Sequence, residues 1–152
     1  MTTQTDQIER DVLIAAPVER VWDLITSAEH LGRWFGDAGA EIDLRPGGAV
    51  VVSWSEYVAH GRVETVEPPH RFAYRWLTSP DAQDATPGNS TLVEFTLAAE
   101  GAGTRVAVVE SGFDGLDLDA DERTARFASH TRGWRLELDE LVDYGSKATE
   151  AR

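Results

Sequence analysis

The sequence contains no cysteine, so disulfide bonds, thiol nucleophiles and cysteine-based zinc or iron–sulfur sites are excluded. Lysine is almost as scarce. Lys147 is the only one, and its place in a polar tail argues against a Schiff-base mechanism. No stretch approaches the roughly 18 apolar residues of a membrane span. The first apolar segment, 12–16, lacks the cationic start and the length of a signal peptide. We therefore expect a cytoplasmic protein that does not insert into membranes.

Positive charge is also in short supply. The chain has 14 Lys and Arg residues against 27 Asp and Glu residues, which gives a formal net charge of −13 at pH 7. A surface this acidic repels phosphate backbones and anionic membrane surfaces. We therefore expect no nucleic-acid partner and no attraction to acidic lipids.

Motifs for nucleotide, serine-hydrolase or metal chemistry are missing as well. No Gly-x-Ser-x-Gly segment occurs, and no glycine-rich phosphate loop is followed by lysine. The glycines on either side of Ala102 are better explained as a hairpin turn. His30, His60 and His70 fall in different predicted elements and show no ligand spacing. The sequence therefore predicts no metal site and no cofactor.

What the chain does contain is enough apolar material for a folded domain. Its 152 residues match the size of one ordinary domain. Five Trp, five Phe and three Tyr exclude intrinsic disorder of the whole chain. We expect residues 1–152 to form a single domain, with an ordered core over about residues 8–145.

Hydrophobic periodicity predicts a strand, two short helices, about six strands and one long helix. Pro17 suits the first turn of the first helix, and Ser27 can cap the second. Asp119 and Glu122 resemble a capping box that opens the last helix, and Gly145 marks its expected end. The predicted strands are 7–15, 40–44, 49–54, 57–66, 71–77, 92–98 and 104–111.

Short turns between these strands favour an antiparallel sheet, and helices on one of its faces make the fold α+β. In the strand 71–77, Phe72, Tyr74 and Trp76 alternate with two arginines and an alanine, which predicts an inner and an outer face. The loop 78–90 is long for a hairpin and is a candidate lid over a binding site.

Several short segments, taken in their order along the chain, carry a resemblance to a known family. They are Ile14-Ala15-Ala16-Pro17-Val18-Glu19-Arg20-Val21-Trp22, Leu31-Gly32-Arg33-Trp34-Phe35, Pro46-Gly47-Gly48, Gly61-Arg62-Val63, Pro68-Pro69-His70-Arg71-Phe72 with Trp76, Gly103-Thr104-Arg105-Val106, Glu110-Ser111-Gly112-Phe113 and Gly133-Trp134. This pattern resembles the START-like, or Bet v 1-like (SRPBCC), superfamily. More narrowly, it resembles the bacterial stand-alone proteins related to the C-terminal domain of the Hsp90 ATPase activator Aha1.

The resemblance implies a helix-grip fold, in which a curved antiparallel sheet (β-α-α-β6-α) wraps around a long C-terminal helix. It also implies an apolar cavity between the sheet and that helix. Relatives bind lipids, sterols, polyketides or hormones there, and some act as cyclases or aromatases. A chaperone of the Hsp90 type is a further partner by resemblance, although the full-length co-chaperone uses a separate N-terminal domain for which this chain has no room.

The predicted ligand-binding side chains are those that the sheet, the short helices and the last helix would turn toward this cavity. They are Trp34, Phe35, Val52, Trp54, Phe72, Tyr74, Trp76, Phe95, Val108, Glu110, Phe113, Phe127, His130, Trp134 and Leu138. Such an apolar wall suits a flat hydrophobic ligand. The alternative, in which these rings fill the core and leave no cavity, stays open.

Three of these residues, Glu110, His130 and Tyr74, are also the candidates for catalysis. Glu110 continues the inward phase of its strand, so its carboxylate could bind a ligand or act as an acid or base. The interpretation that we favour places it at the sheet rim, in contact with water or an arginine. His130 lies one turn before Trp134 and is expected half-exposed on a flank; facing Glu110, it would complete an acid–base dyad.

The function expected from the sequence is therefore binding of a small hydrophobic, aromatic or lipid-like molecule without catalysis, in a carrier, sequestration or stress-resistance role. Two alternatives remain open. One is a cyclase- or hydrolase-like enzyme that uses the same cavity. The other is a chaperone-linked interaction module with a filled core, acting through a surface such as the acidic segment 114–122. A homodimer through an exposed strand edge is compatible with each of them.

Overall fold

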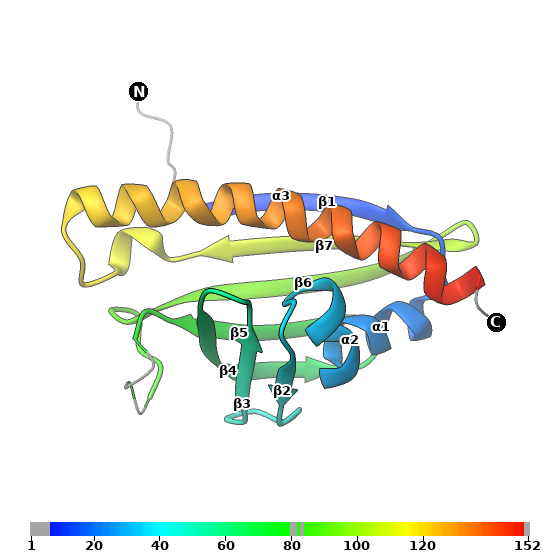
Figure 1. Ribbon diagram of the computed structural model, residues 1–152, viewed down its shortest axis with the longest axis horizontal. Helices are drawn as coiled ribbons and strands as arrows, with labels where there is room; N and C mark the ends of the chain where they lie inside the picture. Colours follow the sequence, from blue (N-terminus) through cyan, green and yellow to red (C-terminus); the bar gives the residue numbers. More distant parts are fainter. Residues whose placement is uncertain (1–6, 80–81, 83, 151–152) are drawn as a thin grey trace.

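The computed structural model describes residues 7–79, 82 and 84–150. Within them, seven antiparallel strands form one sheet in the order β1-β7-β6-β5-β4-β3-β2 (Figure 1). The strands are β1 (Gln7–Ile14), β2 (Ala40–Ile42), β3 (Ala49–Ser53), β4 (Val58–Glu67), β5 (Arg71–Leu77), β6 (Ser90–Glu100) and β7 (Gly103–Ser111). The helices are α1 (Val18–Thr26), α2 (Ala28–Trp34) and α3 (Ala120–Glu150), with the 3-10 turn η1 (Phe113–Gly115) before α3. The predicted α+β fold is confirmed.

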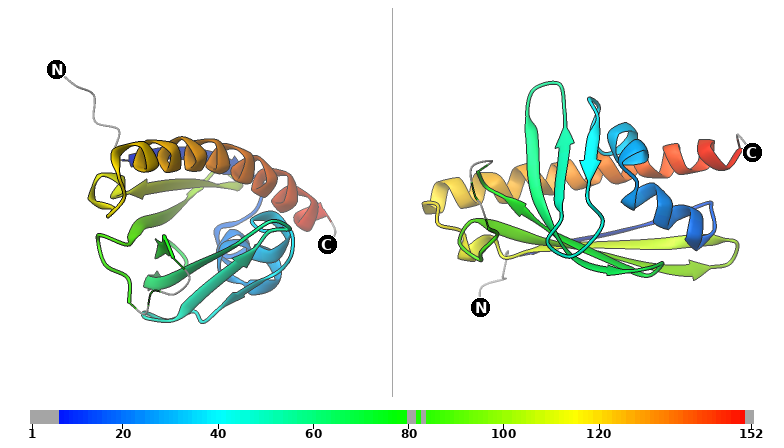
Figure 2. Two further views of the ribbon diagram at one scale, coloured as in Figure 1. Left: turned by 60° about the vertical axis from the view of Figure 1, so that its left-hand side comes forward. Right: turned by 90° about the horizontal axis from the view of Figure 1, so that it is seen from below.

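The sheet is curved, and the helices pack inside the curve. α3 lies along β1 and β7, while α1 and α2 sit at the other side of the sheet's concave face, near one end (Figures 1 and 2). β1 pairs with β7 over its whole length, from Gln7 opposite Ser111 to Ile14 opposite Thr104. The first and last strands in the chain are therefore neighbours, and α3 follows directly from the turn after β7.

Burial confirms the predicted inner face of the sheet. In β5, Phe72, Tyr74 and Trp76 are all buried, and in β7 every second residue from Thr104 to Glu110 is buried. Ala73, predicted on the outer face, is buried too. The period of two in these strands thus places one row of side chains in the core, as expected for a sheet covered on one face.

α3 begins where the sequence predicts, but it ends later. Asp119 Oδ1 accepts a hydrogen bond from the Glu122 N–H (2.8 Å), and Glu122 Oε1 accepts one from the Asp119 N–H (3.2 Å), so the capping box is formed. The predicted end at Gly145 is wrong, because the helix continues past it. A Cβ on Gly145 would lie 2.8 Å from Ile14 Cγ2 and 3.3 Å from Leu24 Cδ1. Glycine at this position therefore lets α3 approach β1 and α1 closely.

Smaller differences concern the ends of other elements. Ser27 occupies the N-cap position of α2, but its side chain makes no capping hydrogen bond. β2 stops at Ile42 rather than at residue 44, and β6 begins at Ser90 rather than at residue 92. Residues 80, 81 and 83 of the predicted lid loop lie outside the described residues.

Aromatic side chains fill most of the space that the sheet encloses. Trp34, Phe72, Tyr74, Phe95 and Phe113 are each at most 2% exposed. The enclosed cavity beside them measures only about 10 Å³, which is at the lower limit for a single water molecule. The rings therefore fill the enclosed interior, and room for a ligand must be sought at its open side.

Candidate functional site

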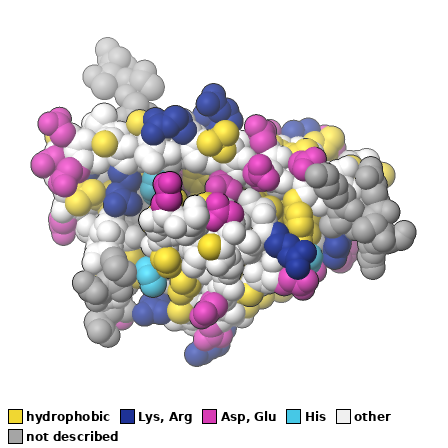
Figure 3. All heavy atoms as spheres, in the orientation of Figure 1, with side chains coloured by type: hydrophobic (Ala, Val, Ile, Leu, Met, Phe, Trp, Pro, Cys, Tyr) yellow, Lys and Arg dark blue, Asp and Glu magenta, His cyan; other side chains and the backbone are white. Residues whose placement is uncertain are grey.

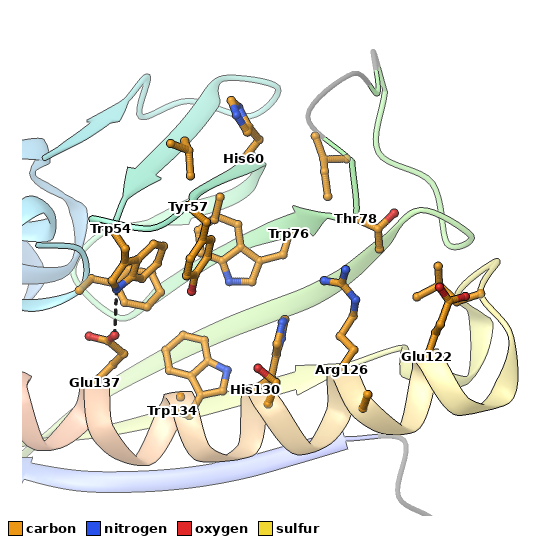
Figure 4. A pocket seen from close by; sticks show the side chains of 18 residues that line it. Trp54, Tyr57, His60, Trp76, Thr78, Glu122, Arg126, His130, Trp134 and Glu137 are labelled. Atoms are coloured by element: carbon orange, nitrogen blue, oxygen red, sulfur yellow. Dashed lines mark hydrogen bonds between the residues drawn. The ribbon is translucent and has the colours of Figure 1, made fainter. Parts of the chain in front are cut away.

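A cleft of about 660 Å³ opens between the hairpin that joins β3 to β4 and one face of α3 (Figure 4). Its volume falls in the usual range for small-molecule sites. Hydrophobic side chains are visible in the hollow below α3 in Figure 3. The hairpin contributes Trp54 and residues 57–60, and the end of β5 contributes Trp76 and Leu77, with Thr78 directly after the strand. The face of α3 contributes Glu122, Ala125, Arg126, Ser129, His130, Gly133, Trp134 and Glu137.

The walls of the cleft are aromatic. Trp54 stacks on Tyr57 with ring centroids 4.8 Å apart, and Tyr57 is 60% exposed. Phe35 contacts all three tryptophans of the cleft, Trp54, Trp76 and Trp134, at centroid distances of 5.5, 5.8 and 5.4 Å. These ring contacts hold the walls in fixed orientations, and flat apolar faces remain accessible to solvent.

Behind the wall on α3, the carboxylate of Glu110 is completely buried. It accepts hydrogen bonds from Thr91 Oγ1 (2.5 Å), Trp134 Nε1 (2.8 Å) and His130 Nδ1 (2.8 Å). These donors lie on β6 and α3, so the carboxylate on β7 joins the helix to the sheet. These three hydrogen bonds compensate for the burial of its oxygens.

The rim position that the sequence favours for Glu110 is wrong. Its side chain does not reach water, and among the described residues no arginine contacts it. The physical reason is that every second side chain of β7 faces the core, up to and including Glu110, and that α3 covers the end of the strand.

The bond to Glu110 orients the ring of His130. An ionised carboxylate can only accept, so Nδ1 carries the proton and Nε2 is the nitrogen left for the cleft. The side chain is 24% exposed and points into the cleft rather than outward on a flank (Figure 4). The ring of Phe113 also contacts the imidazole of His130, edge to face, with ring centroids 5.7 Å apart. The arrangement is that of a base oriented by a carboxylate.

Tyr74, the third catalytic candidate, has no direct access to the cleft. Its hydroxyl is buried and makes no hydrogen bond with the described residues. Burial raises the pKa of the phenol well above its usual value, and the negative charges of Glu110 and Glu137 raise it further. The phenol therefore stays protonated near neutral pH, where it acts as a neutral part of the core.

Glu137 lies at one end of the cleft and connects its two sides. Its Oε2 accepts a hydrogen bond from Trp54 Nε1 at 3.2 Å, between α3 and the hairpin (Figure 4). Burial raises the pKa of this carboxyl to about 7, although the bond from Trp54 opposes the shift; the charges of Glu140 and Asp37 add to it. This end of the cleft therefore changes its charge near neutral pH.

Replacing Glu137 with glutamine is expected to stabilise the protein at pH 8. The folded state holds the carboxyl proton up to about pH 7, whereas the unfolded chain releases it near pH 4.5. The wild type therefore loses stability as the pH rises between these values. Because the group is partly exposed, we expect a gain of about 1–2 kcal/mol at pH 8 and less than half of that at pH 5.

Urea unfolding of both proteins at the two pH values measures this difference. Asp139→Asn is the control, since it removes a carboxylate from the exposed face of the same helix. Equal gains for Glu137→Gln at pH 5 and pH 8 would show that the carboxyl does not titrate in this range.

The structure brings part of the predicted ligand-binding set to the cleft. The predicted residues that line it are Phe35, Trp54, Trp76, His130 and Trp134. The others lie in the core or behind the cleft wall: Trp34, Val52, Phe72, Tyr74, Phe95, Val108, Glu110, Phe113, Phe127 and Leu138. The curvature of the sheet presses this second group together, so that its side chains contact one another rather than a ligand.

Sequence reasoning missed Tyr57, Arg126 and Glu137. A signal for the two helical residues was present, because Arg126, His130, Trp134 and Glu137 follow at spacings of four, four and three. Residues at these spacings share one face of a helix. Tyr57 had no comparable signal, since its position depends on how the hairpin stands over α3.

Residues 15–146 match the family described as Activator of Hsp90 ATPase homolog 1-like protein. The chain belongs to this family. No curated protein sequence matches it significantly. This member of the Hsp90-activator homologue family has a curved seven-stranded sheet and a long C-terminal helix.

Several solved structures share this fold. Protein MLL2253 from Mesorhizobium loti is 22% identical, with a TM-score of 0.72 over 90% of this chain and 94% of that one. The Aha1 dimer from Colwellia psychrerythraea is 16% identical, with a TM-score of 0.73 over 92% of this chain and 96% of that one. CalU16 from Micromonospora echinospora is 24% identical, with a TM-score of 0.66 over 95% of this chain and 79% of that one. At these identities the likeness is one of fold.

Two kinds of site are not found in the described part of the chain. No three or more His, Asp or Glu side chains there come together in a group that could hold a metal ion. None of the helices described combines the length and the apolar character needed to cross a membrane.

Proposed function

We propose that this member of the Hsp90-activator homologue family binds a small, flat hydrophobic molecule in the cleft between the β3–β4 hairpin and α3. The observation that carries the proposal is the aromatic surface left open to solvent there, on Trp54 and Tyr57. Tyr57 and Val58 are 60% and 48% exposed. An exposed apolar patch with a concave shape is typical of a binding site.

Family membership supports this proposal. Proteins of the wider superfamily often bind hydrophobic ligands, and the match extends over residues 15–146. Polar side chains such as Thr78, Arg126 and His130 face the cleft among the rings, where they can fix the orientation of a bound molecule. The corresponding role is that of a carrier, or of a protein that sequesters its ligand.

Gly133 offers a direct test. It lies on the cleft face of α3, and a Cβ added there would meet nothing within 4 Å. Gly133→Leu should therefore occupy part of the cleft, and leucine favours a helix more than glycine does. We expect the affinity for the neutral fluorophore N-phenyl-1-naphthylamine to fall at least about tenfold, because the ligand loses the space it occupies. Fluorescence titration measures the affinity.

Asp139→Leu is the matched control, because it adds the same side chain to the exposed face of the same helix. It should bind the probe as the wild type does. Unchanged affinity in Gly133→Leu would place the probe outside the cleft, and a wild-type protein that does not bind the probe would overturn the proposal.

A second candidate function is general acid–base catalysis in the same cleft, and the oriented Glu110–His130 pair favours it. His130 Nε2 would take a proton from water, whose oxygen attacks the carbonyl of a bound ester, and would return the proton to the departing alcohol. Turnover of an aromatic ester such as 1-naphthyl acetate distinguishes this function from binding alone.

A further inference from the structure

The cleft contains an arginine that has no partner among the residues that the structure describes. Arg126 is half-buried on the cleft face of α3, one turn before His130, and its side chain extends across the cleft toward Trp76 and Thr78 (Figure 4). Within the described part of the chain, its guanidinium forms no ion pair and no hydrogen bond. The protein has 27 acidic and 14 basic side chains, and taking a charge out of water without a partner costs free energy.

The acidic side chains of the cleft do not neutralise Arg126. Glu122 lies one turn earlier, but its Oε1 accepts the N–H of Asp119 in the capping box and lies beyond ion-pair distance of Arg126. Glu137 is at the other end and bonds to Trp54. The helical rise places Arg126 and Glu137 about 16 Å apart along α3. The cleft therefore has Arg126, with Glu122 one turn away, at one end and Glu137 at the other, with aromatic walls between.

We propose that the cleft selects aromatic molecules that carry one anionic group, with the anion bound by Arg126 and the rings against Trp76 and Trp134. This inference rests on the proposed function and adds the chemical class and the orientation of the ligand. A guanidinium binds planar or tetrahedral oxyanions through two parallel N–H bonds, and these bonds are stronger than those between neutral groups. When Glu137 is ionised it disfavours the reversed orientation, because its negative charge would then lie beside the anionic group of the ligand.

Two probes with the same ring system separate charge recognition from hydrophobic binding. They are 8-anilinonaphthalene-1-sulfonate, which is anionic, and N-phenyl-1-naphthylamine, which lacks the sulfonate. In Arg126→Gln, we expect the affinity for the sulfonate probe to fall about tenfold, the loss of one charge-assisted contact. The affinity for the neutral probe should stay within about twofold, because glutamine preserves most of the apolar stem. Fluorescence titrations of both probes give the ratio.

Arg132→Gln is the matched control. Arg132 lies on the same helix and also has no ion pair or hydrogen bond with the described residues, but it is exposed and outside the cleft. It should alter neither affinity, although it changes the net charge by the same amount. Arg126→Lys should retain part of the affinity for the sulfonate, since it keeps the charge and loses the paired bonds.

The outcomes separate this inference from the proposed function. One outcome would overturn the anion site and still support the hydrophobic cleft. In it, Gly133→Leu blocks binding of the neutral probe, but Arg126→Gln leaves the ratio of the sulfonate affinity to the neutral-probe affinity unchanged. Equal weakening of both probes would likewise contradict it, since Arg126 would then act by shape alone. Failure of both probes to bind the wild type would overturn the proposed function itself.

Discussion

Replacing Glu110 with alanine is expected to lower the free energy of unfolding by about 3–5 kcal/mol, as when one partner of a buried charged network is removed. Thr91 Oγ1, Trp134 Nε1 and His130 Nδ1 would lose their common acceptor. A buried donor without a partner costs about 1–3 kcal/mol, and the missing side chain also leaves a void. Urea unfolding at pH 7 measures the difference from the wild type.

Glu94→Ala provides the control for this experiment. Glu94 lies on β6, where its carboxylate is exposed and contacts Arg71 at 3.5 Å. Surface ion pairs of this kind contribute little, so the variant should stay within about 0.5 kcal/mol of the wild type. An equally small effect of Glu110→Ala would show that the carboxylate does not hold α3 against the sheet.

Glu110→Gln keeps the shape of the side chain and changes the chemistry of His130. The amide oxygen can still accept from Trp134, but the amide nitrogen donates to His130 Nδ1, which moves the ring proton to Nε2. Nε2 can then no longer accept a proton from the cleft. If the dyad is catalytic, ester turnover should fall about 10²–10⁴-fold while the neutral probe still binds. Unchanged turnover would assign Glu110 a structural role alone.

Replacing Trp34 with alanine is expected to destabilise the protein to a similar extent, by about 3–5 kcal/mol. The side chain is 1% exposed and stacks on Phe35 at 5.0 Å. Its Nε1 donates to the carbonyl oxygen of Leu24 at 2.7 Å, which joins the end of α2 to α1. Because Trp34 does not line the cleft, the affinity of the folded protein for N-phenyl-1-naphthylamine should stay within about twofold of the wild type.

Trp54 should show the opposite pattern. It is only partly buried and lines the cleft, so Trp54→Ala should weaken binding of the probe about tenfold and destabilise the fold by only about 1–2 kcal/mol. Thermal unfolding and fluorescence titration give both quantities. Trp34→Phe replaces the alanine variant if that protein does not fold. Equal loss of affinity in Trp34→Phe and Trp54→Ala would place the ligand in the enclosed interior instead of the cleft.

The fold could be predicted from the sequence because its signals are local and repeated. The alternation of Phe72, Tyr74 and Trp76 indicates a strand with one buried face, and the Asp119–Glu122 pair indicates the start of α3. The end of α3 could not be predicted from Gly145. A glycine that ends a helix and a glycine that permits close packing look the same in sequence, and only the proximity of Ile14 distinguishes them.

The site was predictable only in part, because it depends on contacts between distant segments. The alternation in β7 predicts that Glu110 faces inward. Its complete burial, however, depends on Thr91 on β6 and Trp134 on α3, which lie far away in the sequence. The cleft itself depends on where the hairpin carrying Tyr57 stands relative to α3. That position follows from the curvature of the whole sheet, which no segment specifies alone.

The pairing of β1 with β7 also affects the protein while it is being synthesised. β1 is complete long before the ribosome reaches β7, where Gln7 pairs with Ser111. At about 5–20 residues per second, the strand waits on the order of 5–20 seconds for its partner. An unpaired strand can meanwhile pair with other nascent chains. Glu9, Arg10 and Asp11 place consecutive charges in the middle of β1, and such charges act as gatekeepers against aggregation until the sheet closes.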